Sequence, residues 1–151
     1  ICIWANDKDL AQCVRGERVV QVDRRNDTIY DAAGVTEKFG VPPPLIPDFL
    51  ALVGDAQDGF PGIRGIGKVT AAKLLGRHGP IEDFPGEVLD GERREMALLF
   101  KDLATLRTDA PLFDDVEELR WRGPGEGFAE WGERMGDDRL LARAREAAEA
   151  A

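Results

Sequence analysis

The sequence has little cysteine and no long apolar run, and both absences narrow the class of protein. Its two cysteines, Cys2 and Cys13, are too few for a disulfide framework and match no metal-ligand spacing. We expect both thiols to be reduced and buried. No apolar stretch approaches the roughly 18 residues that span a membrane, and no basic-then-apolar signal segment opens the chain. These features predict a cytoplasmic protein with no membrane partner.

An initiator methionine is also absent. The chain opens instead on the apolar run Ile1-Cys-Ile-Trp-Ala5, which is typical of a buried parallel strand. A chain rarely begins in the middle of a core strand. The length of 151 residues is compatible with one compact domain or with part of a larger one. We therefore expect the C-terminal portion of something longer, or a truncated piece.

Acidic residues are missing from one stretch, although they dominate the chain. The net charge of −9 argues against binding of nucleic acid over the whole surface. From Gly59 to Pro80 there is no Asp or Glu at all. The positive side chains of this stretch are Arg64, Lys68, Lys73 and Arg77. A basic island in an acidic chain suits a protein that touches DNA on one face; chance clustering on a solvated helix is the alternative.

Glycine is concentrated in the same stretch. Gly62, Gly65 and Gly67 allow positive φ and a close approach of the backbone to another surface. Between them, Ile63 and Ile66 are expected to fix a hairpin against the core. This pattern resembles the helix-hairpin-helix family of proteins that bind the DNA backbone. A purely structural turn is the alternative interpretation.

A helix that begins immediately after Gly67 would make this hairpin an anion site. Its first N–H groups have no partner within the helix, and they point outward with the positive end of the helix dipole behind them. The nucleotide-binding pattern Gly-x-x-x-x-Gly-Lys-Ser/Thr fails, because Val69 follows Lys68. We therefore expect a DNA backbone rather than a nucleotide. The predicted DNA-binding residues are Gly62, Arg64, Gly65, Gly67, Lys68, Thr70 and Lys73.

Two pairs of aspartates are candidates for a metal site. Asp7 and Asp9 lie just beyond the first predicted strand, where open α/β sheets bind ligands. Asp55 and Asp58 begin the glycine-rich loop. Clustered carboxylates repel one another unless a cation joins them, and hard divalent ions favour such oxygen ligands. Each pair alone fits ordinary caps and turns, but the hairpin attached to the second pair favours a metal.

The remaining pattern predicts a mostly helical α/β protein. Alternation over 18–23 indicates a second strand, and 27–30 a turn or short strand. A short helix is expected over 10–14, capped by a neighbouring aspartate. Helical spacing and glycine stops predict the other helices. They are expected over 32–39, 46–53, 68–75 (with Val69, Ala72 and Leu75 facing inward), 81–84, 93–106 and 128–150.

Three segments in order resemble one family. They are Ala5-Asn-Asp-Lys-Asp-Leu-Ala-Gln12, the run from Gly54 through the hairpin to Leu75, and Leu103-Ala-Thr-Leu-Arg-Thr-Asp109. Together they are similar to the bacterial 5′-3′ exonuclease and flap endonuclease family, which includes the nuclease domain of bacterial DNA polymerase I. The likeness runs from about residue 1 to residue 113.

The resemblance implies a fold and an activity. The fold would be the C-terminal part of a PIN-like nuclease core (1–45), a helix-three-turn-helix module of helix-hairpin-helix type (46–113), and a C-terminal helical segment (114–151). The activity would be metal-dependent 5′-3′ hydrolysis of nicked or flapped DNA in replication and repair. Two Mg²⁺ or Mn²⁺ ions would be held by Asp7, Asp9, Asp55 and Asp58 as the downstream ligands. The hairpin would bind K⁺ through backbone carbonyls.

Other implications concern partners, location and the limits of the likeness. A monomer in the bacterial cytoplasm, associated with the nucleoid, is expected. The family's upstream half, with an aspartate on the first strand and an acidic cluster on a later helix, has no counterpart here. The 151 residues alone are therefore expected to be incomplete as a nuclease. A non-catalytic module that binds the DNA backbone and a structural fragment are the alternatives.

Overall fold

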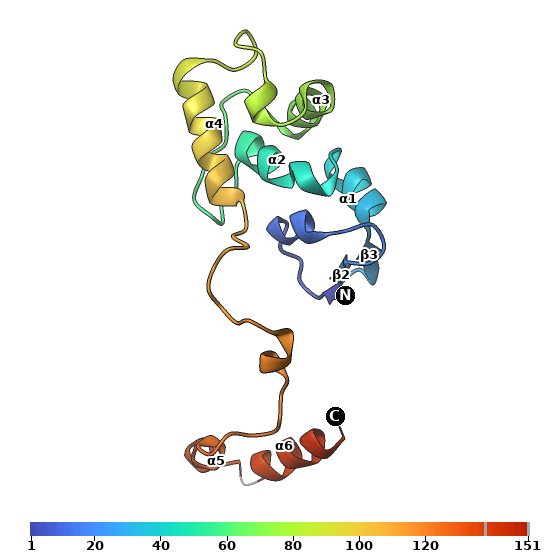
Figure 1. Cartoon of the computed structure of the whole chain (residues 1–151), viewed down its shortest axis with the longest axis vertical. Helices are drawn as coiled ribbons and strands as arrows, with labels where there is room; N and C mark the ends of the chain where they lie inside the picture. The colour runs from blue at the N-terminus through green and yellow to red at the C-terminus, as the bar shows by residue number, and fades with distance from the viewer. Residues whose placement is uncertain (138, 151) are drawn as a thin grey trace. The chain divides into compact units, whose positions relative to one another are not determined.

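A computed structural model describes residues 1–137 and 139–150 (Figure 1). It divides into two compact units, Ile1–Thr108 and Asp109–Ala151. The division into 1–45, 46–113 and 114–151 expected from the sequence stays a prediction. No helix among the described residues has the length and apolar character needed to cross a membrane.

The first unit carries a small sheet and four α-helices. The strands are β1 (Cys2–Ile3), β2 (Val20–Asp23) and β3 (Thr28–Tyr30). The α-helices are α1 (Ala32–Phe39), α2 (Ile46–Val53), α3 (Lys68–His78) and α4 (Gly91–Ala104). Short 3-10 turns join them at η1 (Asp9–Cys13), η2 (Pro43–Leu45) and η3 (Ile81–Asp83). The fold is thus α/β and mostly helical, as the sequence predicts.

The sheet has the order β1-β2-β3, with β1 parallel to β2 and β3 antiparallel to β2. The predicted parallel strand is therefore confirmed, but its burial is not. Ile1 is 80% exposed, Trp4 is 65% exposed and Cys2 is exposed. The physical reason is that β1 is an edge strand, paired only with β2 among the described residues. Cys13 is half-buried, so the expectation of two buried thiols is wrong.

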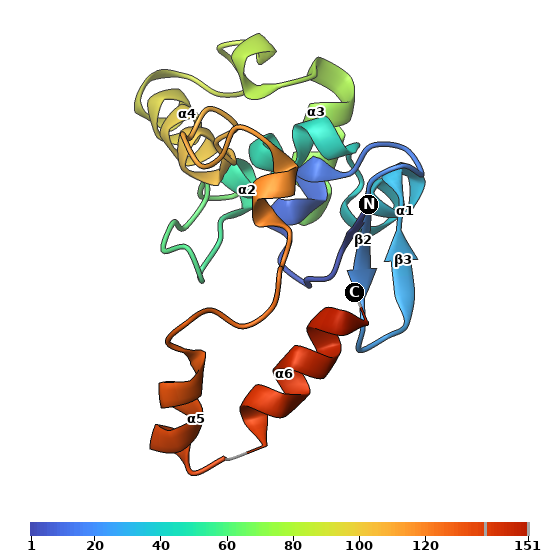
Figure 2. The same cartoon turned by 60° about the horizontal axis from the view of Figure 1, so that its bottom comes forward.

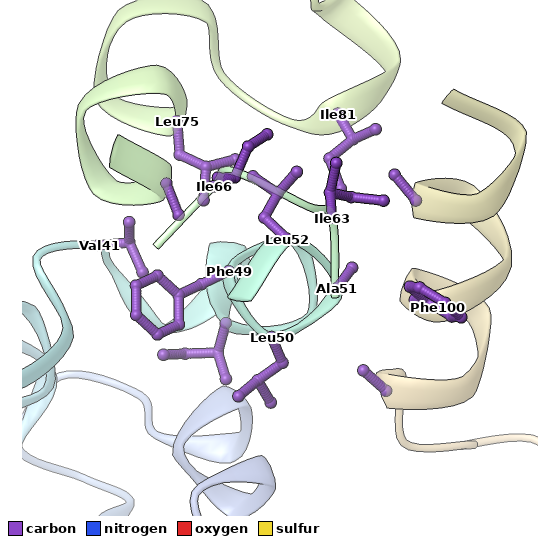
Figure 3. Packing of buried hydrophobic residues seen from close by; sticks show 14 of the residues in the cluster. Val41, Phe49, Leu50, Ala51, Leu52, Ile63, Ile66, Leu75, Ile81 and Phe100 are labelled. Carbon is purple, nitrogen blue, oxygen red and sulfur yellow. The ribbon is translucent and has the colours of Figure 1, made fainter. Parts of the chain in front are cut away.

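Helix α2 is the centre of the core. Every residue from Ile46 to Leu52 is buried. Figure 3 shows its side chains meeting Val41, Leu75 and Ile81 on one side and Phe100 of α4 on the other. Its one buried charge, Asp48, accepts from the backbone N–H of Ile81 at 2.8 Å and pairs with Lys101 at 2.8 Å. The most apolar predicted helix therefore becomes the element on which the others pack.

The short helix α1 shows how local sequence sets the ends of an element. Asp31 caps it by accepting from the N–H of Gly34 at 2.7 Å. Gly40 ends it in the left-handed conformation, with φ of 77°. The observed bounds of α1 and α2 are those predicted from the sequence. By contrast, the helix expected over 10–14 is the 3-10 turn η1. Its N-cap residue is Lys8, whose side chain forms no capping hydrogen bond.

The second unit contains η4 (Val116–Leu119), α5 (Phe128–Met135) and α6 (Leu140–Glu149), shown in orange and red in Figure 2. The sequence predicted one helix over 128–150, and this is wrong. Gly136 ends α5 in the left-handed conformation at φ of 68°. An aspartate cap orders the earlier turn: Asp115 accepts from the N–H of Glu117 at 2.9 Å and forms a capping box with Glu118.

Candidate metal centre and nucleic-acid interface

Three of the four predicted metal ligands come together. Asp9, Asp55 and Asp58 each offer a carboxylate oxygen, and these oxygens all lie within 4.8 Å of one another. Asp9 begins η1, just beyond the end of β1, whereas Asp55 and Asp58 follow α2. Residues 46 positions apart in the chain thus share one site because η1 packs against α2.

Asp7 lies beside this group rather than within it. Its side chain is exposed, and Oδ1 accepts from the N–H of Asp9 at 3.2 Å. Its backbone carbonyl accepts from Nε2 of Gln21 at 2.5 Å. Asp7 therefore shapes the turn that presents Asp9, and its charge contributes to the field around Asp9.

The electrostatics of Asp9 fit a bound cation. Burial, a hydrogen bond with Asp58 and the charges of Asp58, Asp7 and Asp55 raise the pKa of Asp9 to about 7. Its Oδ1 is buried and has no hydrogen-bond partner. Such an unpartnered acceptor among like charges is costly. A divalent cation would supply the missing partner and relieve the repulsion, so the donor set fits a hard metal ion.

Asp55 is the most constrained of the three acids, at 2% exposed. Burial acts to raise its pKa, but Lys8, with Nζ 2.6 Å from Oδ2, and the backbone N–H groups of Gln57 and Asp58 together lower the pKa of Asp55. The N–H of Gln57 donates to Oδ1 at 3.0 Å. The sequence analysis assigned no role to Lys8. The place of Lys8 between two acids in the sequence was the signal that could have revealed its ion pair.

The loop after α2 closes back on itself. Asp55 and Phe60 exchange backbone hydrogen bonds of 2.9 and 3.1 Å, and the N–H of Ile63 donates to the carbonyl of Leu52 at 2.8 Å. At its base the backbones of Gly54 and Gly62 touch. A Cβ added to Gly62 would lie 2.4 Å from the nitrogen of Gly54, and one added to Gly54 would lie 2.8 Å from the nitrogen of Gly62. The candidate metal ligands Asp55 and Asp58 are thus joined directly to the hairpin by backbone hydrogen bonds and a close backbone contact.

The hairpin has the expected orientation. Ile63 and Ile66 are buried at 4% and 8% exposure, so they anchor it in the core. Gly62 and Gly65 have positive φ, of 73° and 87°. Gly67 does not: its φ is −93° and it forms the N-cap of α3 in an extended conformation. Of the three glycines, Gly67 therefore does not use the positive φ that glycine allows.

The start of α3 faces solvent. Gly67 provides no side-chain cap, so the first N–H groups of the helix, which have no partner within it, gain none from the N-cap side chain. Val69 is 70% exposed, which contradicts the prediction that it points inward; Ala71 and Leu75 are the buried residues of α3. The inward face begins one turn later than expected because the first turn projects beyond the core.

The predicted DNA-binding side chains lie exposed along this region. They are Arg64, Lys68, Thr70 and Lys73. The carbonyl of Arg64 accepts from Arg93 of α4 at 3.3 Å, a contact that the sequence did not indicate. Gln21 was also missed: it is 3% exposed and ties β2 to the loop of Asp7 through the carbonyls of Ala5 and Asp7. A polar side chain inside an apolar strand was the signal.

Comparisons with known proteins place this architecture in a family. A family model described as 5′-3′ exonuclease, C-terminal SAM fold, matches residues 41–126, which is more than half of the chain. The chain belongs to this family, and the resemblance noted from the sequence is confirmed.

Among similar proteins is a 5′-3′ exonuclease of Aquifex aeolicus, 37% identical over 129 residues, covering 81% of this chain and 44% of the relative. DNA polymerase I of Pseudomonas aeruginosa is 39% identical over 143 residues, covering 83% of this chain and 15% of that protein. The chain thus spans less than half the length of either relative.

Solved structures agree on the fold. T5 5′-exonuclease with bound divalent metal ions (zinc) has a TM-score of 0.53 at 17% identity, covering 68% of this chain and 39% of that one. The T5 D15 protein co-crystallized with metal ions has a TM-score of 0.54 at 18% identity, with coverages of 68% and 41%. The fold is that of the corresponding part of a PIN-like nuclease with a helix-hairpin-helix module.

Proposed function

We propose that this chain supplies the downstream metal ligands and the duplex-binding hairpin of a metal-dependent 5′-3′ exonuclease or flap endonuclease. The observation that carries the proposal is the convergence of Asp9, Asp55 and Asp58 within 4.8 Å. The loop bearing two of them is bonded directly to the hairpin. Membership of the exonuclease family supports the same assignment.

Each part of the site has a distinct task in this function. Bound Mg²⁺ or Mn²⁺ ions would polarise the scissile phosphate and lower the pKa of a water. Asp9, Asp55 and Asp58 are the residues that would hold them, with Asp7 orienting Asp9. Lys8 fixes the position of Asp55. The N–H groups at the start of α3 and the nearby cations hold the sugar–phosphate backbone, without reading bases.

The substrate, the cellular location and a monovalent ion belong to the same proposal. The substrate would be DNA with a nick, gap or 5′ flap, and the site of action the bacterial cytoplasm, near the nucleoid. Potassium would bind at the hairpin, 62–66, through backbone carbonyls that glycine leaves uncovered. T5 5′-exonuclease was solved with bound divalent metal ions, which supports a divalent metal here.

Metal binding tests the first half of the proposal. Titration of Mn²⁺ by calorimetry is expected to give a site that Asp58→Asn weakens by at least about 10-fold, because a ligand oxygen becomes a neutral amide. Asp102→Asn serves as the matched control, since Asp102 is exposed and, within residues 1–137 and 139–150, pairs only with Arg107. Equal Mn²⁺ affinity in both variants would remove the aspartate cluster as the metal site.

Hydrolysis separates a nuclease from its alternative, a non-catalytic module that binds the DNA backbone. The ion pair of Lys8 with Asp55 favours the alternative, because it neutralises one prospective ligand without a metal. A 5′-labelled flap substrate with Mg²⁺ distinguishes them, using this chain and a version extended upstream. Cleavage by the extended protein that Asp58→Asn abolishes supports the nuclease. DNA binding without cleavage in both would support the module.

A further inference from the structure

A small pocket lies among three elements of the first unit and is lined by three lysines. Lys8 comes from the turn before η1, Lys38 from the last turn of α1, and Lys68 from the first residue of α3. The pocket has a volume of about 190 Å³. Its remaining lining is mostly apolar: Phe39, Phe49, Leu50, Val53 and Gly54.

Close packing fixes Lys38 at this place. Gly40, which ends α1, approaches α3 so closely that an added Cβ would lie 2.8 Å from the Cβ of Ala72. Phe39 packs edge-on against Phe49 of α2, with ring centroids 5.8 Å apart. The last turn of α1 is therefore held against both α2 and α3, and Lys38 is held with it.

The charges around the pocket are not balanced. Lys8 pairs with Asp55. In the described part of the chain, neither Lys38 nor Lys68 lies within ion-pair distance of a carboxylate. The Lys38 ammonium instead lies 4.1 Å from the centre of the Tyr30 ring, a contact that leaves its charge uncompensated. Three lysine side chains line this pocket, and Lys38 and Lys68 have no carboxylate partner in the described part of the chain, so an anion is the ligand that these two charges would stabilise.

The pocket also has a defined position between the two halves of the candidate site. Lys8 contacts Asp55 of the carboxylate group, and Lys68 opens α3 directly after the hairpin. We propose that this pocket receives a backbone phosphate of duplex DNA and that Lys38 is a further DNA-binding residue. The proposal rests on the DNA-binding function proposed above and adds α1 to the surface that contacts the duplex.

Salt-dependent binding of a duplex oligonucleotide to the full chain tests this assignment. Lys38→Ala is expected to lower the slope of log affinity against log salt by about 0.9, since one phosphate contact is lost. Lys38→Arg keeps the charge and should keep the slope. Arg18→Ala is the control for net charge, because it removes one exposed cation that does not line the pocket. Circular dichroism of each variant checks that the fold is retained.

The outcomes separate this inference from the proposed function. If the unmodified chain binds duplex DNA and Lys38→Ala leaves the slope unchanged, the pocket inference fails and the hairpin function stands. If the unmodified chain does not bind DNA, both fail. A last experiment measures the binding of inorganic phosphate alone by calorimetric titration. Phosphate binding that needs Lys38, with an unchanged DNA slope, would assign the pocket to a free anion and overturn the assignment to DNA.

Discussion

Single residues determine the chemistry of the carboxylate site by their environments. Asp9 and Asp55 face the same space, yet their pKa values shift in opposite directions. Burial and neighbouring acids dominate at Asp9, whereas Lys8 and backbone N–H groups together overcome the effect of burial at Asp55. One carboxyl therefore tends to hold a proton near neutral pH while the other is ionised, so a metal ion would compete with a proton chiefly at Asp9.

This contrast predicts a pH effect on the metal-free protein. Asp9 has a pKa of 3.8 when unperturbed and about 7 in the fold, so folding binds a proton between these values and stability falls as pH rises through them. Asp9→Asn removes that dependence. With a chelator present, the melting temperature of the variant should gain on that of the unmodified chain between pH 5 and pH 8 (approximate limits). A constant difference across this range would contradict the assignment.

The buried ion pair between α2 and α4 is a second feature of residue scale. Lys101 contacts Asp48 and Glu82, which raise the pKa of Lys101 against the opposing effect of burial. At Glu82, burial acts to raise the pKa, but Lys101 acts to lower it, and the pKa of Glu82 is lowered. The stabilisation by Lys101 is thus present below its usual pKa and lost as pH rises past its folded value. The stabilisation by Glu82 is present above the usual pKa of Glu82 and is lost as the pH falls past the pKa of Glu82 in the folded protein.

Removing the lysine leaves Asp48 buried with a single backbone donor. Lys101→Met is expected to lower the free energy of unfolding by about 3 kcal/mol at neutral pH, measured by urea denaturation. Arg107→Ala breaks an ion pair in which both side chains are about two-thirds exposed, and it should cost less than about 1 kcal/mol. Similar losses in the two variants would mean that Asp48 does not depend on Lys101.

At the scale of elements, the junction of α2 with the hairpin is the decisive feature. The positive φ of Gly54 and Gly62, of 92° and 73°, and the contact of their backbones leave no room for a side chain at either position. The backbone bonds of Asp55 with Phe60 then close the loop. The proposed metal ligands and the proposed phosphate-binding hairpin are consequently parts of a single element rather than neighbours.

Substitution of these glycines tests the junction. Gly62→Ala is expected to destabilise the first unit by more than about 2 kcal/mol, because the strain of positive φ, roughly 1–2 kcal/mol, is joined by a clash with backbone atoms. Gly59→Ala is the matched control: φ is 82°, but nothing lies within 4 Å of an added Cβ. Both variants are compared by thermal unfolding. Equal effects would show that φ alone matters and that the close approach does not.

Sequence patterns predicted elements better than they predicted exposure. The bounds of α1 and α2 followed from an apolar period and glycine stops, which are local signals. Local signals did not predict the exposure of Val69, because that exposure depends on how far the first turn of α3 projects from the core. The approach of Asp9 to Asp55 is likewise tertiary; it was inferred from family likeness, whereas the Lys8 ion pair and the Gln21 bonds were not foreseen.

At the scale of the whole molecule, the two units differ in content. Every residue of the carboxylate group, the hairpin and the lysine pocket lies in Ile1–Thr108. The second unit presents acidic turns and amphipathic helices, with Trp131 and Met135 exposed. The sequence identified its helical character but missed the break at Gly136, because glycine inside a helical pattern is a weak signal unless its φ is known.

This distribution predicts that a chain ending at Thr108 keeps both proposed binding activities. Its Mn²⁺ affinity and its duplex DNA affinity should each lie within about 3-fold of those of the full chain, because no proposed ligand is removed. Calorimetry and fluorescence anisotropy provide the two measurements. A loss of DNA affinity with retained Mn²⁺ binding would assign part of the duplex contact to Asp109–Ala151 and would limit the role of the hairpin.

The contact between Gly54 and Gly62 also constrains how the sequence can change by descent. The space that a side chain would need at one glycine is occupied by the backbone at or beside the other, so a compensating exchange of a third residue cannot restore it. The loop between them carries Asp55 and Asp58, and the backbone bonds of Asp55 with Phe60 tie its length to the position of these carboxylates. Among homologous sequences we therefore expect the two glycines to be inherited as a pair and the number of residues between them to be kept.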